Sequence, residues 1–189
     1  YHCVVAINKT TVLVIGGSNG NGPTKETYLY NFEFNQWSNG TELLTERIGH
    51  ACGVFQNSTN WMIAVIGGYN DQIELLDLVE FAVLDEDNIQ TMTWEWKCGP
   101  QFPLKVAFST AVSSNSKLYV VGGTTEQDSS SSWLNTIYEL ADNLTWIELP
   151  QKMSLARSSV AAIILPDDLV TCEYKKPSSK LTGRNNGEL

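Results

Sequence analysis

The residues of this chain that could do chemistry are few, and its four cysteines come first. They are Cys3, Cys52, Cys98 and Cys172. No two of them have the close spacing, such as Cys-X-X-Cys, from which tetrahedral zinc sites are usually built. The even count is compatible with two disulfides in an oxidising compartment, whose pairing the sequence leaves open, or with buried free thiols.

Histidines, a glycine-rich stretch and an acidic stretch are equally poor candidates for a cofactor site. His2 and His50 are the two histidines, too few for a copper or zinc centre built within this chain. The string GGSNGNG at residues 16–22 imitates a phosphate-binding loop, but a strand pattern follows where such a loop needs a helix. The stretch Asp85 to Asp87 could hold calcium, although an exposed loop insertion explains it better. We therefore predict no cofactor and no metal.

Asparagine side chains offer a different chemistry, because the chain contains four Asn-X-Ser/Thr sequons. Their acceptor residues are Asn8, Asn39, Asn57 and Asn143. All four fall in predicted turns or directly after a predicted strand, where a glycan is tolerated. We expect N-glycosylation at these positions and a secreted or extracellular location.

Charge and hydropathy exclude two classes of protein. The 189 residues include 12 Lys and Arg against 21 Asp and Glu, a net charge of −9, which repels the phosphate backbone of nucleic acids. No apolar run approaches the roughly 18 residues that a spanning helix needs, so no membrane span is predicted. Residues 173–189 form a polar, basic tail that we expect to be disordered. Because the start at Tyr1 lacks the pattern of a signal peptide, we expect a processed end or a cut fragment.

The elements that must position these residues repeat along the chain. Three short apolar runs end in glycine pairs, which are Gly16 and Gly17, Gly67 and Gly68, and Gly122 and Gly123. An aromatic residue and then a tryptophan follow each pair: Tyr30 and Trp37, Phe81 and Trp94, Tyr138 and Trp146. An alternating segment precedes each run, and a fourth copy of it, at 157–165, precedes a short apolar segment at 168–172. Each unit therefore has the pattern of a four-stranded antiparallel meander, with little or no helix.

This pattern resembles kelch repeats, the four-stranded blades of a β-propeller. The resemblance implies an all-β fold with three complete blades, at about 1–44, 45–103 and 104–153, and a partial fourth at 154–172. Propellers close with roughly 4 to 8 blades. We therefore expect half of a ring of about six blades, completed by upstream sequence or by a second copy.

The blade pattern predicts the role of several singled-out residues. The repeated aromatic residues should fill the wedge between neighbouring blades. Cys3 and Cys52 fall at equivalent points of the first two units, and we expect them to be too far apart to bond to each other. Arg47 and Arg157, with Lys105 in the middle unit, match the basic residue that often precedes the first kelch strand. We interpret these three, and the two histidines, as structural.

The resemblance also separates the two faces of the propeller. The loops after the glycine pairs emerge on one face, whereas three of the four sequons lie on the other. The open face carries the candidate binding residues Tyr69, Asn70, Asp71 and Trp133. We predict a non-catalytic module that binds a protein or glycan partner there.

Two other functions stay open at this stage. One is a propeller enzyme, of the copper oxidase or sialic-acid isomerase type, whose active site is shared with further blades. The other is a structural assembly subunit, in which copies associate through exposed blade edges.

Overall fold

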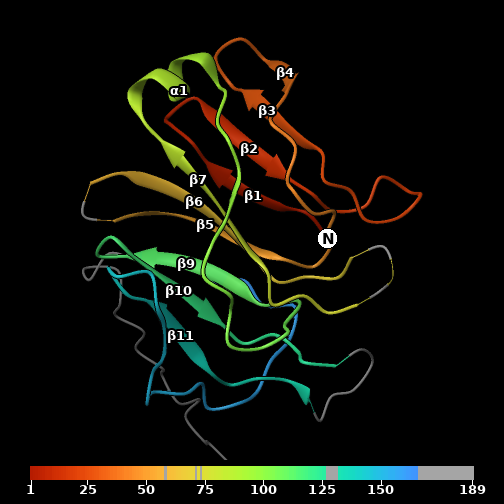
Figure 1. Cartoon of the computed structure of the whole chain (residues 1–189), viewed down its shortest axis with the longest axis vertical. Helices are drawn as coiled ribbons and strands as arrows, with labels where there is room; N and C mark the ends of the chain where they lie inside the picture. Colours follow the sequence, from red (N-terminus) through yellow and green to blue (C-terminus); the bar gives the residue numbers. More distant parts are fainter. Residues whose placement is uncertain (58, 71, 73, 127–131, 166–189) are drawn as a thin grey trace, which may run out of the picture.

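Three four-stranded antiparallel sheets follow one another along the chain (Figure 1). The computed structural model describes residues 1–57, 59–70, 72, 74–126 and 132–165. Blade 1 contains β1 (Cys3–Ala6), β2 (Thr11–Ile15), β3 (Thr27–Asn31) and β4 (Gln36–Asn39). Blade 2 contains β5 (Ala51–Gln56), β6 (Trp61–Ile66), β7 (Val79–Leu84) and β8 (Lys97–Cys98). Blade 3 contains β9 (Thr110–Ser114), β10 (Lys117–Val121), β11 (Ile137–Leu140) and β12 (Trp146–Glu148). Strands pair in chain order within each blade, which confirms the predicted meanders.

The burial pattern of the second strand in each blade shows how many faces of that blade are covered by a neighbouring blade. In β6, every residue after Trp61 is buried, because blade 2 has a neighbour on both sides. In β2 and β10, buried and half-buried residues alternate. Blades 1 and 3 thus have one covered face each in the described chain, as expected for the two ends of a propeller arc.

The cores lie between the blades and not within them. One cluster of buried apolar side chains joins blades 1 and 2, and a second joins blades 2 and 3. The first strands β1, β5 and β9 pack side by side in succession. This is the arrangement of radial blades whose first strands lie nearest a common axis.

The glycine pairs are required by the backbone where each second strand ends. Gly67 and Gly68 have φ angles of +64° and +98°, a left-handed conformation that costs a residue with a Cβ about 1–2 kcal/mol. A Cβ on Gly67 would also lie 2.2 Å from the carbonyl oxygen of Val106. The other two pairs have nearly the same φ angles, so the repeated glycines mark one repeated turn.

The acidic insertion in blade 2 folds differently from the predicted exposed loop. Residues 86–91 form a short helix, α1 (Glu86–Thr91), at the upper left of Figure 1. The N–H of Ile89 donates to the carbonyl of Asp85 at 3.0 Å. Ile89 and Met92 then pack against the core between blades 1 and 2, and this apolar contact folds the insertion back onto the blade. No helix in the described ranges is long and apolar enough to cross a membrane.

The strand expected within residues 157–165 does not form. The segment starts as the other inter-blade connections do, with the N–H of Ser159 donating to the carbonyl of Phe108 at 2.8 Å. Up to residue 165, where the described part of the chain ends, no strand follows, and Ile163 is 75% exposed. A strand needs a hydrogen-bonded neighbour, and the expected neighbour at 168–172 lies outside the described residues, as does the predicted tail at 173–189.

Candidate binding face and the joints between blades

The loops after the glycine pairs and the connections between blades lie on one face, toward the right of Figure 1. Isolated backbone bridges tie these two kinds of segment together. Ile48 and Tyr69 exchange two hydrogen bonds of 2.9 and 2.8 Å, and Ala107 and Thr124 exchange two of 3.0 and 2.8 Å. We call this surface the glycine-loop face. Its backbone is held by hydrogen bonds near the blades, so side chains there are presented from a fixed platform.

The four candidate binding residues have different environments on this face. Tyr69 is only 4% exposed, so it supports the face from below instead of contacting solvent. The Oδ1 atom of Asn70 accepts the N–H of Glu74 at 2.8 Å, which closes its own loop. Asp71 lies outside the described residues. Trp133 is 46% exposed.

Phe108 is a residue of this face that the repeat pattern did not predict. Its φ of +55° is left-handed, and the equivalent residue of blade 2 is Gly49, with φ +64°. A bulky residue in this conformation stores about 1–3 kcal/mol of strain. The half-buried Phe108 ring packs 5.2 Å from Tyr1 and 5.8 Å from Tyr69, measured between centroids. Comparison of RIGH at 47–50 with VAFS at 106–109 would have revealed a phenylalanine in a glycine position.

A hollow of about 490 Å³ lies beside Trp133. Arg157, Ser158, Ser159 and Val160 complete most of its lining. Arg157 forms no ion pair among the described residues, and it is exposed. The hollow therefore combines an aromatic ring with a solvated guanidinium.

Three sequons lie in turns on the face opposite the glycine-loop face. In each of them the asparagine Oδ1 accepts the N–H and the hydroxyl of the sequon threonine. Asn8 and Asn143 are exposed, whereas Asn57 is half-buried and its Nδ2 donates to the sulfur of Met62 at 3.3 Å. Asn39, the last residue of β4, is exposed as well.

The expectation about the first two cysteines is wrong, because Cys3 and Cys52 form a disulfide with a Cα–Cα distance of 6.0 Å. The strand register gives the reason. Cys3 pairs with Ile15, whereas Cys52 pairs with Val65, one place further from the end of the second strand. The two cysteines therefore point in opposite directions on adjacent innermost strands, each toward the other. Cys98 is an exposed free thiol, and Cys172 lies outside the described residues.

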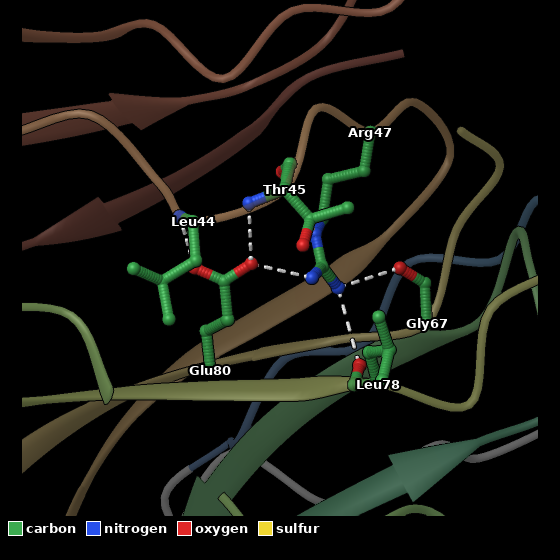
Figure 2. Close-up of polar contacts among 6 residues, drawn as sticks. All are labelled: Leu44, Thr45, Arg47, Gly67, Leu78 and Glu80. Atoms are coloured by element: carbon green, nitrogen blue, oxygen red, sulfur yellow. Dashed lines mark hydrogen bonds and ion pairs between the residues drawn. The ribbon is translucent and has the colours of Figure 1, made fainter. Parts of the chain in front are cut away.

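The joint between blades 1 and 2 has a buried ion pair at its centre (Figure 2). Arg47 is 0% exposed, and its Nη2 lies 2.6 Å from Oε1 of Glu80 on β7. Its Nη1 donates to the carbonyls of Gly67 and Leu78 at 2.9 and 3.1 Å. The carboxylate of Glu80 also accepts the N–H groups of Leu44 and Thr45, at 2.7 and 3.1 Å. Every charged atom of the pair is thus satisfied, as a buried pair requires.

His50 lies in the same joint and is structural, as its recurrence predicted. Its Nε2 lies 3.0 Å from the carbonyl oxygen of Ile15 in blade 1, so Nε2 carries the proton and donates it. Burial, and then the positive charge of Arg47, lower the pKa of His50 to about 3. The ring is therefore neutral at physiological pH and acts as a hydrogen-bond donor between blades.

The joint between blades 2 and 3 uses the same backbone with apolar side chains. The N–H of Val106 donates to a carbonyl after the preceding glycine pair, and its carbonyl accepts the N–H of Gly68, as the backbone of Arg47 does with Gly17. Val106, and not the exposed Lys105, is therefore the counterpart of Arg47. Tyr138 is the counterpart of Glu80. Glu80 pairs with the buried Val65 of β6, and Tyr138 pairs with the buried Val120 of β10.

The repeated aromatic residues are not equivalent in the way their spacing predicted. Phe81 and Tyr138 are buried in the second joint, whereas Tyr30 and Trp37 lie together on the open face of blade 1, with Trp37 62% exposed. Tyr30 pairs with Val12 of β2, whereas Tyr138 pairs with Val120 of β10, which lies two places closer to its glycine pair. Differences of one or two residues in loop length shift the register, so equal roles cannot be read from residue order alone.

Trp96, and not Trp94, is the counterpart of the other two repeated tryptophans. It directly precedes β8, next to the paired residues Phe81 and Lys97. Its Nε1 donates to the carbonyl of Thr41 in the preceding connection at 2.9 Å. Trp146 makes the corresponding bond to the carbonyl of Pro100 at 3.1 Å. Trp94 is buried in the first joint.

Groups suited to metal binding are absent from the described ranges, where no three His, Cys, Asp or Glu residues could hold one ion together. Among the residues that the structure describes, Arg47 is the one fully buried cation, and it is engaged on all sides by the joint. Arg47 therefore has the structural role that its place before the first strand predicted.

Radial four-stranded blades, joined through repeated backbone contacts at glycine pairs, define an arc of a kelch-type β-propeller. Comparison with known families agrees, since the sequence profile of the KLHDC2/KLHL20/DRC7 Kelch-repeats domain matches residues 1–173. No curated protein sequence matches significantly. The chain belongs to the kelch-repeat family, whose domains typically serve as protein-interaction modules.

Proposed function

We propose that this chain is a secreted, non-catalytic propeller module that binds a protein partner through the glycine-loop face. The observation that carries the proposal is the strained Phe108 on that face. Backbone strain persists where the surrounding structure enforces it, and such residues cluster at functional sites. Phe108, Tyr1 and the partly exposed Trp133 give the face aromatic side chains, the residue type that dominates binding hot spots.

The opposite face supports the same assignment. Glycans on Asn8 and Asn143 would cover that face and leave the glycine-loop face open. The Cys3–Cys52 disulfide is compatible with an oxidising compartment. Intact mass before and after enzymatic deglycosylation of the secreted protein tests this part, and we expect loss of mass with occupancy at Asn8 and Asn143. An unchanged mass would refute the glycosylation.

The binding face is tested by comparing proteins retained from extracellular fluid on immobilised wild type and variants. Trp133→Ala and Phe108→Ala should each lose the retained partner. Phe34→Ala is the matched control, because Phe34 is 67% exposed in the turn between β3 and β4, on the other face. Retention that survives both face variants, or that Phe34→Ala alone abolishes, would contradict the proposal.

Phe108→Gly separates binding from backbone strain. Glycine relieves the left-handed conformation, as at Gly49, but removes the ring. We expect this variant to unfold no more easily than wild type and to lose the partner. A variant that still binds would assign no role in recognition to the ring.

A further inference from the structure

The glycine-rich string at residues 16–22 has a chemistry that partner binding does not use. It contains two asparagine–glycine pairs, Asn19–Gly20 and Asn21–Gly22, and a third pair, Asn39–Gly40, lies at the end of β4. In such a pair the backbone nitrogen of the glycine can attack the side-chain amide carbon of the asparagine, because no Cβ obstructs the approach and the glycine backbone rotates freely. Residue type does not distinguish the three pairs, so their surroundings decide which of them reacts.

The first pair lies at the tip of a small exposed loop on the glycine-loop face. A backbone bridge between Ser18 and Pro23 closes this loop. Asn19 and Gly20 are both exposed. Beyond the chain neighbours of Gly20, no atom lies within 4 Å of the place where a Cβ on Gly20 would stand. The peptide bond between Asn19 and Gly20 therefore has room to rotate toward the asparagine side chain.

The side chain of Asn19 is already folded toward the nitrogen that would attack it. Its Oδ1 accepts the backbone N–H of Asn21 at 3.0 Å, which is the hydrogen bond of an Asx turn. The nitrogen of Gly20 belongs to the segment that this turn spans, so the turn brings Cγ of Asn19 toward it. The same hydrogen bond polarises the side-chain carbonyl and stabilises the negative charge that develops on Oδ1 during the attack. The loop thus favours the reaction by both orientation and electrostatics.

The attacking nitrogen is weakly held in the first pair and firmly held in the third. The N–H of Gly20 donates to the exposed hydroxyl of Ser18 at 3.3 Å, a long hydrogen bond that water can replace. The N–H of Gly40 instead donates to the carbonyl of Thr27 at 2.9 Å. A Cβ on Gly40 would also clash with Oγ1 of Thr27, so its backbone is closely packed. We therefore expect the Asn39–Gly40 pair to be inert while the chain is folded.

An Asx turn is not sufficient for this reaction, and the chain offers its own comparison. The same hydrogen bond, from the second N–H along the chain to the asparagine Oδ1, closes turns at Asn8, Asn31, Asn57 and Asn143. A residue with a Cβ follows each of these asparagines in the sequence: Lys9, Phe32, Ser58 and Leu144. Among the Asx turns of the described ranges, the one at Asn19 is thus distinguished by the glycine that follows it.

We propose that Asn19 is a site of spontaneous deamidation, at which the folded chain converts an amide into a carboxylate. The nitrogen of Gly20 bonds to Cγ of Asn19, and the bond between Cγ and Nδ2 breaks. The proton of the Gly20 N–H passes through water to the leaving amine, which departs as ammonia and leaves a cyclic succinimide. Water then adds to either carbonyl carbon of the ring and opens it to aspartate or isoaspartate. Each conversion adds one negative charge to the glycine-loop face, whatever partner that face binds.

Peptide mapping by mass spectrometry, during incubation at mildly alkaline pH, measures the deamidation rate of each asparagine separately. The protein is made in a host that does not glycosylate, because enzymatic removal of a glycan itself converts asparagine into aspartate. In the folded chain, Asn19 should react at least about tenfold faster than Asn39, since orientation of reacting atoms has effects of this size or larger. Asn21, which no Asx turn orients in the described ranges, should react at an intermediate rate. In concentrated urea with reductant, where no turn remains, the three rates should become similar.

Lys9→Gly tests whether an exposed Asx turn followed by glycine is enough. It places a glycine after the exposed turn at Asn8 and should make Asn8 a second fast site of the folded chain. Lys9→Ala is the matched control and should leave Asn8 slow. Three results would each overturn the proposal: a folded chain in which Asn19 reacts no faster than Asn39 or Asn21, rate ratios that urea leaves unchanged, or an Asn8 that stays inert in Lys9→Gly.

Discussion

The two joints between blades share one backbone arrangement but fill it with opposite chemistry. At the first joint, the buried ion pair Arg47–Glu80, the His50 hydrogen bond and a disulfide connect blades 1 and 2. At the second, Val106 and Tyr138 take the places of the ion pair, and Phe102 packs 4.9 Å from the ring of Tyr138. The first joint depends on paired charges, and the second depends on apolar surface and aromatic packing.

The difference shows that the repeat determines where the residues of each connection lie, but not which residue types occupy those positions. A glycine pair and the backbone bonds around it set where each connection meets the next blade. Within that frame, a fully satisfied ion pair and a well-packed apolar pair are alternative solutions. They differ in how they fail: a half-broken ion pair leaves a buried charge, whereas a trimmed apolar contact leaves a cavity.

Breaking the first joint at Arg47 should have the largest effect. Arg47→Ala leaves the Glu80 carboxylate buried without its cation, which costs about 3–5 kcal/mol of unfolding free energy. Urea unfolding followed by tryptophan fluorescence measures it. Lys105→Ala, at the exposed neighbour of the corresponding position in the second joint, should change stability by less than about 0.5 kcal/mol. Equal losses of unfolding free energy in the two variants would show that the first joint does not depend on its buried ion pair.

Removing the disulfide should have the next largest effect, again confined to the first joint. The bond closes a loop with a sequence separation of 49, for which chain entropy predicts at most about 4 kcal/mol. Replacing Cys3 and Cys52 by alanine should lower stability by about 2–4 kcal/mol. Cys98→Ser, at an exposed free thiol, is the control and should have little effect. If reductant leaves the wild-type midpoint unmoved, the disulfide contributes nothing to the joint.

Acid should weaken the first joint through His50. Its folded-state pKa, about 3, lies below the 6.5 of the unfolded chain, so the unfolded state binds the proton first as pH falls. Stability is therefore complete above pH 6.5 and is lost between pH 6.5 and about 3. At pH 5.5 the loss is about 1.4 kcal/mol relative to pH 7.5. His50→Gln should remove this part of the pH dependence, and an identical pH profile in the variant would contradict the assignment.

Matched tryptophan substitutions should show where the two joints are alike. Trp96→Phe and Trp146→Phe each remove one indole hydrogen bond to the preceding connection. Each should cost about 1 kcal/mol, measured by the same urea titration. A clear loss at one position and none at the other would mean that these tryptophans are not equivalent members of the repeat.

The sequence predicted the blades because glycine pairs and apolar strands are local signals. The pairs are required by left-handed backbone at fixed points, and each buried second strand is a continuous or alternating apolar run. The register of the strands could not be predicted in this way, because turns of unequal length move residues by one or two places. This is why Cys3 and Cys52 bond, why Trp96 replaces Trp94, and why Val106 replaces Lys105.

The candidate site was less predictable than the fold, for a physical reason. Burial on a loop depends on what packs beneath it, and Tyr69 is covered by contacts with a distant connection. Phe108 was overlooked because its left-handed backbone conformation cannot be recognised from its residue type. Trp133 could be proposed from the sequence because a large apolar side chain in a polar loop is a local signal, and its role in binding stays a prediction.

The exchangeability of the two joints is tested most directly by copying the second joint into the first. Arg47→Val and Glu80→Tyr are made singly and together, and their unfolding free energies are compared in a double-mutant cycle. The Arg47→Val single variant should lose several kcal/mol, about 3–5, and the double variant should recover most of that loss because no buried charge remains. A double variant whose loss of unfolding free energy equals the sum of the two single losses would show that the two joints do not share one backbone arrangement.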